Sequence, residues 1–349
     1  MELLKKMYEI HSMSGREKKL KRFVRKWISA NIPDAKMSND NLGNIYVVKG
    51  VSETYPCLVA HLDQVQNSHS RDFKALEVDD IIIGYSQKSR AQQGLGADDK
   101  NGVWVALKCL LKYDNIKIAL FVSEEVGCVG SNAADMSFFN DARFVIQCDR
   151  RGANDLITVA GWTKLCSKDF VDAINPSIYG YKEETGMLTD VLTLKERGLP
   201  VSCINISCGY YEPHTSYEFT CISDLMNCLA FVENIIETCT DVYPHEYSLY
   251  SYYDDYDDYD HLYSNDDIFL NKQPETKTYD SEGLITNKRD FYELYWDAVK
   301  EFVESIPTAS FDDLLWYLQQ THKTTYFWED WTKELFNDVK RYVKIGLTV

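Results

Sequence analysis

The amino-acid sequence predicts an α/β fold, in which helices cover both faces of a mainly parallel central sheet to give a three-layer α/β/α domain. Two observations support this prediction. Strand-like and helix-like segments alternate between residues 94 and 238. The segment 56–61, Pro-Cys-Leu-Val-Ala-His, is a nearly continuous apolar run, which is typical of a strand buried on both faces of a sheet.

The first ninety residues predict two helices and several strands. The apolar residues of the second helix recur at helical spacing: Leu20, Phe23, Val24 and Trp27. The segment 73–85 resembles a hairpin that turns at Asp79-Asp80. The elements expected here are helices over 2–10 and 16–31 and strands over 45–48 and 56–61.

A glycine-rich loop, Gly94-Leu-Gly-Ala-Asp98, opens the alternating region. The elements expected after it are a helix over 99–113, a strand over 116–122, a helix from Ser131, a strand over 144–148, a strand around 157–159, a helix over about 189–197, a strand over 201–206 and a helix over 222–238. This order predicts a mainly parallel sheet.

The periodic pattern stops near residue 240. A tract rich in Tyr and Asp follows without helical or strand periodicity, and we interpret 241–285 as a linker. Amphipathic patterns return over 286–349 and predict a small all-helical C-terminal unit, in which Ser310-Phe-Asp-Asp313 has the form of a capping box. The α/β domain is therefore expected to span 1–240.

Charge and composition exclude several classes of partner. A net charge of −17 opposes binding to nucleic acid or anionic lipid through bulk electrostatics. The N-terminal segment carries scattered charges, unlike a secretory signal, and no stretch approaches the ~18 apolar residues of a spanning helix. The ten cysteines form no Cys-x-x-Cys pair, and several lie in apolar runs, as expected of reduced buried thiols. We predict a cytoplasmic protein with no nucleic-acid or membrane partner.

Side chains that can bind metal follow successive predicted strands. They are His61 and Asp63, Asp98 and Asp99, Glu124 and Glu125, Asp149, and His214. Each alone has an ordinary explanation: a surface turn, helix N-cap and first-turn acids, a solvated face, an ion-pair cluster at Asp149-Arg150-Arg151, or a hydrogen-bonded loop histidine. Paired carboxylates repeated at one sheet edge, however, are electrostatically costly without cations. Two imidazoles and three carboxylates suit a pair of Zn²⁺ ions, or alternatively Mn²⁺ or Co²⁺.

The order of these motifs resembles the co-catalytic di-zinc exopeptidase superfamily, peptidase clan MH. The matching motifs are His61-x-Asp63, Gly96-Ala-Asp98-Asp99-Lys100, Glu124-Glu125-Val-Gly, Asp149 and Pro213-His214. The superfamily includes peptidase T, carboxypeptidase G, aminoacylase and the tetrahedral and glutamyl aminopeptidases. The resemblance covers about residues 1–240 and implies a phosphorylase/hydrolase-like catalytic domain.

The resemblance also implies a role for each residue. It gives five metal ligands, with Asp98 shared between two ions: His61 and Asp149 complete one site, Glu125 and His214 the other. Glu124 would be the general base that deprotonates a bridging water and returns the proton to the leaving amine, and Asp63 would orient His61. The peptide bond after Asp98 is often cis in such enzymes. If the segment at Glu124-Glu125 is extended, the two side chains point to opposite sides, so one can bind metal while the other faces the water.

The spacing of the motifs leaves no room for an inserted lid domain. His61 and Asp98 are 37 positions apart, and Asp149 and His214 are 65 apart. We therefore expect a di-metal catalytic domain without a lid, and any oligomer not to be lid-mediated. The expected function is aminopeptidase action on short peptides through a bridging hydroxide. The alternatives are an N-acyl amino acid deacylase or a carboxypeptidase, since the same metal centre serves all three, and a non-catalytic metal-binding scaffold.

Overall fold

The computed structural model describes residues 1–161 and 163–249, and beyond them 279–280, 283–284, 299–300, 302–303, 310–311, 313–314, 318, 333, 336–337 and 339–340. The chain forms two units, Met1–Asp260 and His261–Val349.

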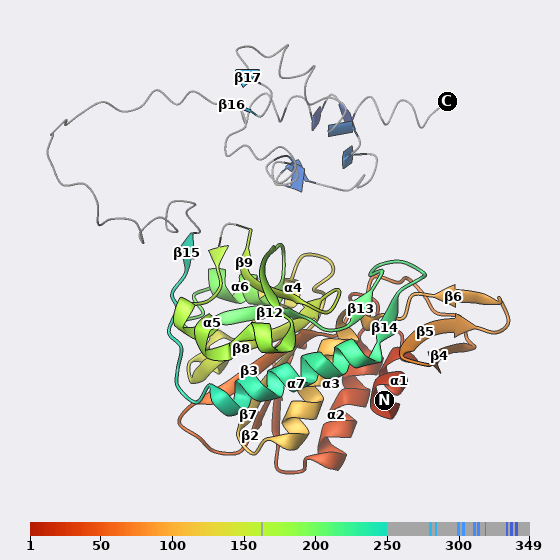
Figure 1. Ribbon diagram of the computed structural model, residues 1–349. Helices are drawn as coiled ribbons and strands as arrows, with labels where there is room; N and C mark the ends of the chain where they lie inside the picture. Colours follow the sequence, from red (N-terminus) through yellow and green to blue (C-terminus); the bar gives the residue numbers. More distant parts are fainter. Residues whose placement is uncertain are drawn as a thin grey trace, which may run out of the picture. The chain divides into compact units, whose positions relative to one another are not determined.

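A ten-stranded sheet forms the centre of the first unit (Figure 1). Its order is β1-β2-β7-β3-β8-β12-β9-β10-β15, with β11 also paired to β9. The strands are β1 (Lys36–Asn39), β2 (Ile45–Lys49), β3 (Tyr55–His61), β7 (Ile116–Phe121), β8 (Ala142–Arg150), β9 (Asp155–Ala160), β10 (Thr163–Lys164), β11 (Lys182–Gly186), β12 (Cys203–Ser207) and β15 (Ser248–Leu249). The four central strands, β7, β3, β8 and β12, are parallel, whereas β2 and β9 flank them in antiparallel register. The predicted α/β class is confirmed.

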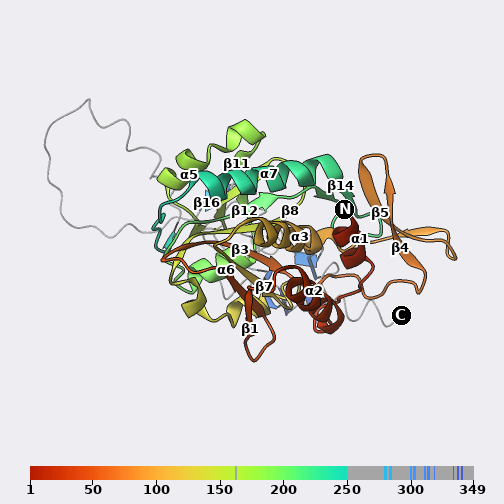
Figure 2. The same cartoon turned by 90° about the horizontal axis from the view of Figure 1, so that it is seen from below.

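Helices cover both faces of this sheet (Figure 2). They are α1 (Glu2–Tyr8), α2 (Lys18–Asn31), α3 (Ala97–Lys112), α4 (Val129–Asn132), α5 (Lys168–Ile174), α6 (Asp190–Glu196) and α7 (Ile222–Thr238). Two separate clusters of buried hydrophobic side chains result. One includes Leu107 of α3 and Ile235 of α7, and the other includes Val191 and Leu194 of α6. The helix expected from Ser131 is only the short α4, whereas α7 has its predicted bounds.

A second, smaller sheet lies beside the first. It contains β4 (Phe73–Val78), β5 (Ile81–Ser86), β6 (Ala91–Gln93), β13 (Tyr210–Tyr211) and β14 (Phe219–Cys221), in the order β13-β14-β5-β4 with β6 paired to β5. The predicted hairpin turns at Asp79-Asp80 as expected, with Asp79 at a φ of 52°. The pairing of β14 with β5 was not predicted. It places β14, which follows the loop that contains His214, along the same edge of β5 as β6, which precedes α3.

The predicted linker, 241–285, and helical unit, 286–349, lie largely outside the described residues. Residues 248–249 form β15 and pair with β10. In the second unit the predicted capping box is confirmed, because Asp313 accepts from the Ser310 backbone N–H at 2.6 Å and its own N–H donates to the Ser310 hydroxyl at 3.2 Å.

All ten cysteines are free thiols, and nine of them are buried. They therefore act as small core side chains, as predicted. Across the described part of the chain, no helix combines the length and apolarity needed to span a bilayer.

Candidate metal centre

His61 lies at the carboxyl end of β3 and is 1% exposed. Its Nε2 is 3.0 Å from Oδ1 of Asp98 and 3.6 Å from Oδ1 of Asp149. On the other side of the ring, Nδ1 is 3.5 Å from Oδ1 of Asp63, beyond the usual range for a hydrogen bond. Asp63 therefore faces the imidazole of His61, as expected for a residue that orients it, but the contact is longer than a hydrogen bond.

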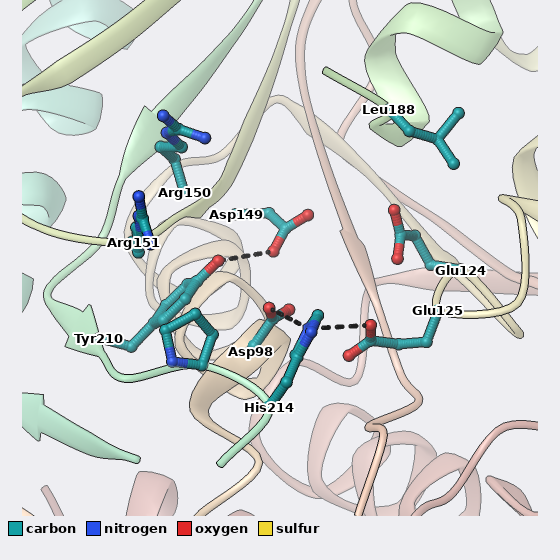
Figure 3. A pocket seen from close by; sticks show the side chains of 10 residues that line it. Asp98, Glu124, Glu125, Asp149, Arg150, Arg151, Leu188, Tyr210 and His214 are labelled. Carbon is teal, nitrogen blue, oxygen red and sulfur yellow. Dashed lines mark hydrogen bonds and ion pairs between the residues drawn. The ribbon is translucent and has the colours of Figure 1, made fainter. Parts of the chain in front are cut away.

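Asp98 lies at the start of α3, and its peptide bond to Asp99 is cis. The two oxygens of Asp98 face different imidazoles. Oδ1 faces His61, and Oδ2 is 3.3 Å from Nε2 of His214 (Figure 3). A carboxylate in this position can be shared by two cations.

Asp149 lies near the carboxyl end of β8, between two polar neighbours. Gln147 donates to its Oδ2 from Nε2 at 3.0 Å, and the hydroxyl of Tyr210 lies 3.4 Å from its Oδ1. These contacts orient the carboxylate towards His61.

Glu124 and Glu125 lie in a turn after β7, and the expectation of an extended segment is wrong. The backbone N–H groups of Gly127 and Cys128 both donate to the carbonyl of Glu124, at 2.9 and 2.7 Å, which closes the turn. Both carboxylates consequently line the same pocket (Figure 3). Oε2 of Glu125 is 3.1 Å from Nε2 of His214.

Asp63 has a second role that the sequence did not indicate. Its carboxylate accepts hydrogen bonds from the backbone N–H groups of Glu124 and Glu125, at 2.9 and 3.2 Å, and from the hydroxyl of Ser14 at 2.7 Å. Asp63 thus fixes the turn that presents both glutamates.

These side chains form two groups of potential ligands that share one carboxylate. The groups are His61, Asp98 and Asp149, and Asp98, Glu125 and His214, each with its ligand atoms within 4.8 Å of one another. All five residues predicted as ligands therefore come together. His61, Glu125 and Asp149 lie at or after the ends of strands of the large sheet. The strands before Asp98 and His214 are β6 and β13 of the small sheet, so the expectation that all five follow strands of one sheet is wrong.

The electrostatics of the cluster favour bound cations. Burial, reinforced by neighbouring carboxylates, raises the pKa of Glu124 to about 8 and raises the pKa of Glu125 and Asp149. Hydrogen bonds to Asp98 and Glu125 raise the pKa of His214 to about 10. Oε1 of Glu125 is buried without a partner among the described residues. Histidine nitrogens and carboxylate oxygens are ligands that Zn²⁺ accepts, so the residues present fit a pair of divalent ions.

Two buried carboxylates hold the backbone around the cluster. Glu218 accepts from the backbone N–H groups of Ala97 and Asp98 at 3.0 and 3.1 Å, and Asp99 accepts from that of His61 at 3.1 Å. Sequence reasoning missed Glu218 because it belongs to no motif and precedes a strand of only three residues.

A pocket of about 270 Å³ opens over these residues. It is lined by Asp98, Glu124, Glu125, Asp149, Arg150, Arg151, Leu188, Tyr210, Pro213 and His214. The alternative interpretation of residues 149–151 as an ion-pair cluster is wrong, since Arg150 pairs through Nε with Asp155 at 3.1 Å instead of with Asp149.

Comparison with known proteins identifies the fold. No protein-family profile and no curated protein sequence matches the chain. Among solved structures, aminopeptidase PepT from Bacillus cereus ATCC 10987 is similar with a TM-score of 0.57 at 14% identity, over 69% of this chain and 98% of that one. The chain has the α/β fold of this aminopeptidase.

Two further structures have the same peptidase fold. An aminopeptidase from the archaeon Desulfurococcus kamchatkensis is 18% identical, with a TM-score of 0.53 over 69% of this chain and 96% of its own. A tripeptidase from Staphylococcus aureus subsp. aureus mu50 is 15% identical, with a TM-score of 0.53 over 68% and 96%. The peptidase fold thus accounts for nearly the whole of these proteins but at most 69% of this chain.

Proposed function

We propose that the chain is a two-metal exopeptidase that hydrolyses a terminal amide bond, acting as an aminopeptidase on short peptides. The observation that carries the proposal is the position of Asp98, whose two oxygens lie 3.0 and 3.3 Å from the Nε2 atoms of His61 and His214. His61, Asp98 and Asp149 would hold one ion, and Asp98, Glu125 and His214 the other.

Two divalent ions held by these residues would supply the Lewis acidity that activates water and polarises the carbonyl of the scissile amide. Glu124 takes the proton from the attacking water and delivers it to the leaving amine. Burial raises the pKa of Glu124 to about 8, and cations held by the neighbouring ligands would lower this pKa and favour the ionised form that acts as a base. The carboxylate of Asp63 keeps Glu124 in place by accepting a hydrogen bond from the backbone N–H of Glu124.

Other hydrolytic activities remain as alternatives, because the same centre can act on an N-acyl amino acid or at a peptide C-terminus. A non-catalytic metal-binding scaffold is the alternative from another class. Glu124 argues against the scaffold, because a buried carboxylate that is not needed as a ligand raises the electrostatic cost of the site.

The test is hydrolysis of three substrates, Leu-Ala, N-acetyl-leucine and benzyloxycarbonyl-Ala-Leu, with added Zn²⁺, Mn²⁺ or Co²⁺ and after chelation. We expect metal-dependent cleavage of Leu-Ala to be fastest. Faster cleavage of either blocked substrate would assign the deacylase or carboxypeptidase activity instead. Absence of cleavage in every metal would contradict an enzymatic role.

A further inference from the structure

The pocket over the metal centre has a basic side. Arg150 and Arg151 line it together with four carboxylates, and they lie on the side of Tyr210, opposite Leu188 (Figure 3). Neither guanidinium forms an ion pair with a carboxylate of the pocket. Arg150 is paired through Nε with Asp155 alone, and Arg151 pairs with no carboxylate in the described parts of the chain.

The backbone that carries these arginines is fixed by the end of β12. The N–H of Cys208 donates to the carbonyl of Arg150 at 2.9 Å, and the hydroxyl of Ser207 donates to the carbonyl of Arg151 at 2.7 Å. The backbone of both arginines is therefore held in place, which lowers the entropic cost of binding a ligand.

The charge balance of the pocket differs from that of the whole chain. The chain carries a net charge of −17. Within the pocket, two divalent ions would offset the four carboxylates, and Arg150 is already paired with Asp155, so the charge of Arg151 would be left in excess. An anionic group on a substrate would then be attracted to the arginine side, in spite of the overall charge.

We propose that Arg151, together with Arg150, binds a carboxylate of the substrate, an inference that rests on the proposed exopeptidase function. Guanidinium groups bind carboxylates through paired, charged hydrogen bonds. The pocket volume of about 270 Å³ lies just below the usual range for ligand sites. The substrate class is therefore an amide whose free carboxylate lies within one or two residues of the scissile bond, such as a dipeptide or tripeptide. Leu188, 62% exposed, gives the opposite side an apolar surface for a substrate side chain.

The carboxylate could come from the α-carboxyl group of a short peptide or from an acidic side chain. Three substrates separate these sources: Leu-Ala, Leu-Ala-amide and Leu-Glu-amide. Each is assayed with the wild-type protein, Arg151→Gln and Arg151→Lys. Arg22→Gln, on the exposed side of α2, is the matched control.

We expect the ratio of kcat/KM for Leu-Ala to kcat/KM for Leu-Ala-amide to fall at least about tenfold in Arg151→Gln, which is the size of a lost charged hydrogen bond. The ratio should recover in part in Arg151→Lys. It should stay unchanged in Arg22→Gln. If instead the ratio for Leu-Glu-amide over Leu-Ala-amide falls, the bound carboxylate is that of a side chain. Ratios that do not depend on Arg151 overturn the proposal while leaving peptidase activity intact.

If no substrate is cleaved, the proposed exopeptidase function is contradicted, but the carboxylate site can still be tested by a binding measurement. Leu-Ala and Leu-Ala-amide are titrated calorimetrically into the Zn²⁺-treated Glu124→Gln protein, with and without Arg151→Gln. Tighter binding of the free acid that is lost with Arg151→Gln supports the carboxylate site. Equal affinity for the acid and the amide overturns it.

Discussion

The carboxylate of Glu218 accepts a hydrogen bond of 3.1 Å from the backbone N–H of Asp98, although 120 positions separate them in the chain. It also accepts from the N–H of Ala97 at 3.0 Å. Glu218 is fully buried and lies beside β14, so the small sheet is connected directly to the backbone of Asp98, the residue shared by both groups of candidate ligands.

Glu218→Gln is expected to weaken metal binding. The amide places an NH₂ donor where backbone N–H groups need an acceptor, so the segment around Asp98 shifts. Changes next to metal ligands typically reduce metal affinity by about 10- to 100-fold. Competition with a chromophoric chelator measures the Zn²⁺ affinity, with the exposed Glu53→Gln as control. An unchanged affinity in Glu218→Gln would show that this contact does not position Asp98.

Glu124→Gln is expected to reduce turnover by about 10²- to 10⁴-fold, because the amide cannot accept the proton of the attacking water. Its metal content should stay that of the wild type, since Glu124 is outside both groups of ligands. Steady-state kinetics and elemental analysis of the same preparation measure the two effects. Retained activity would exclude Glu124 as the base.

His69 should make stability depend on pH in the acidic range. Burial, with help from the charge of Lys100, lowers its pKa from 6.5 to about 3 in the folded protein. The unfolded chain therefore binds the proton first, so the stabilisation is complete above pH 6.5 and is lost as the pH falls towards 3. Over this range the free energy of unfolding should fall less steeply with decreasing pH in His69→Gln than in the wild type. The difference in slope should be up to about 1.4 kcal/mol per pH unit. Urea unfolding at pH 8, 6 and 5 measures the difference, and parallel curves for the two proteins would refute the assignment.

Removal of metal should leave the fold in place. The two hydrophobic clusters on the faces of the large sheet do not include the candidate ligands. Chelation should therefore preserve the far-UV circular dichroism spectrum while lowering the melting temperature, because carboxylates such as Glu124 stay buried without cations and take up protons. Loss of the helical signal in chelator at 25 °C would mean that the metal is needed for folding.

The sequence predicted the elements whose pattern is local. The buried strand β3 and the amphipathic helix α7 have strong apolar patterns, and the turn at Asp79-Asp80 follows from its flanking strands. The motif order also identified the five side chains that the structure brings together. The cis bond after Asp98 was expected from the resemblance and is present.

The remaining features depend on contacts between distant segments, which a single sequence does not reveal. The two- and three-residue strands β13 and β14 are too short to show periodicity, and Phe219 of β14 pairs with Ile83. The same long-range pairing explains why Glu218 was missed. The turn at Glu124 depends on Asp63, which accepts hydrogen bonds from the backbone N–H groups of Glu124 and Glu125. The sequence indicated only its position beside His61.

The most direct test of the shared metal centre is the number of Zn²⁺ ions bound per chain after dialysis against Zn²⁺, measured by elemental analysis for the wild type and Asp98→Ala. Since Asp98 belongs to both groups of ligands, we predict two ions per wild-type chain and loss of both in the variant. A wild-type chain that binds none, or a variant that keeps two, would contradict the account.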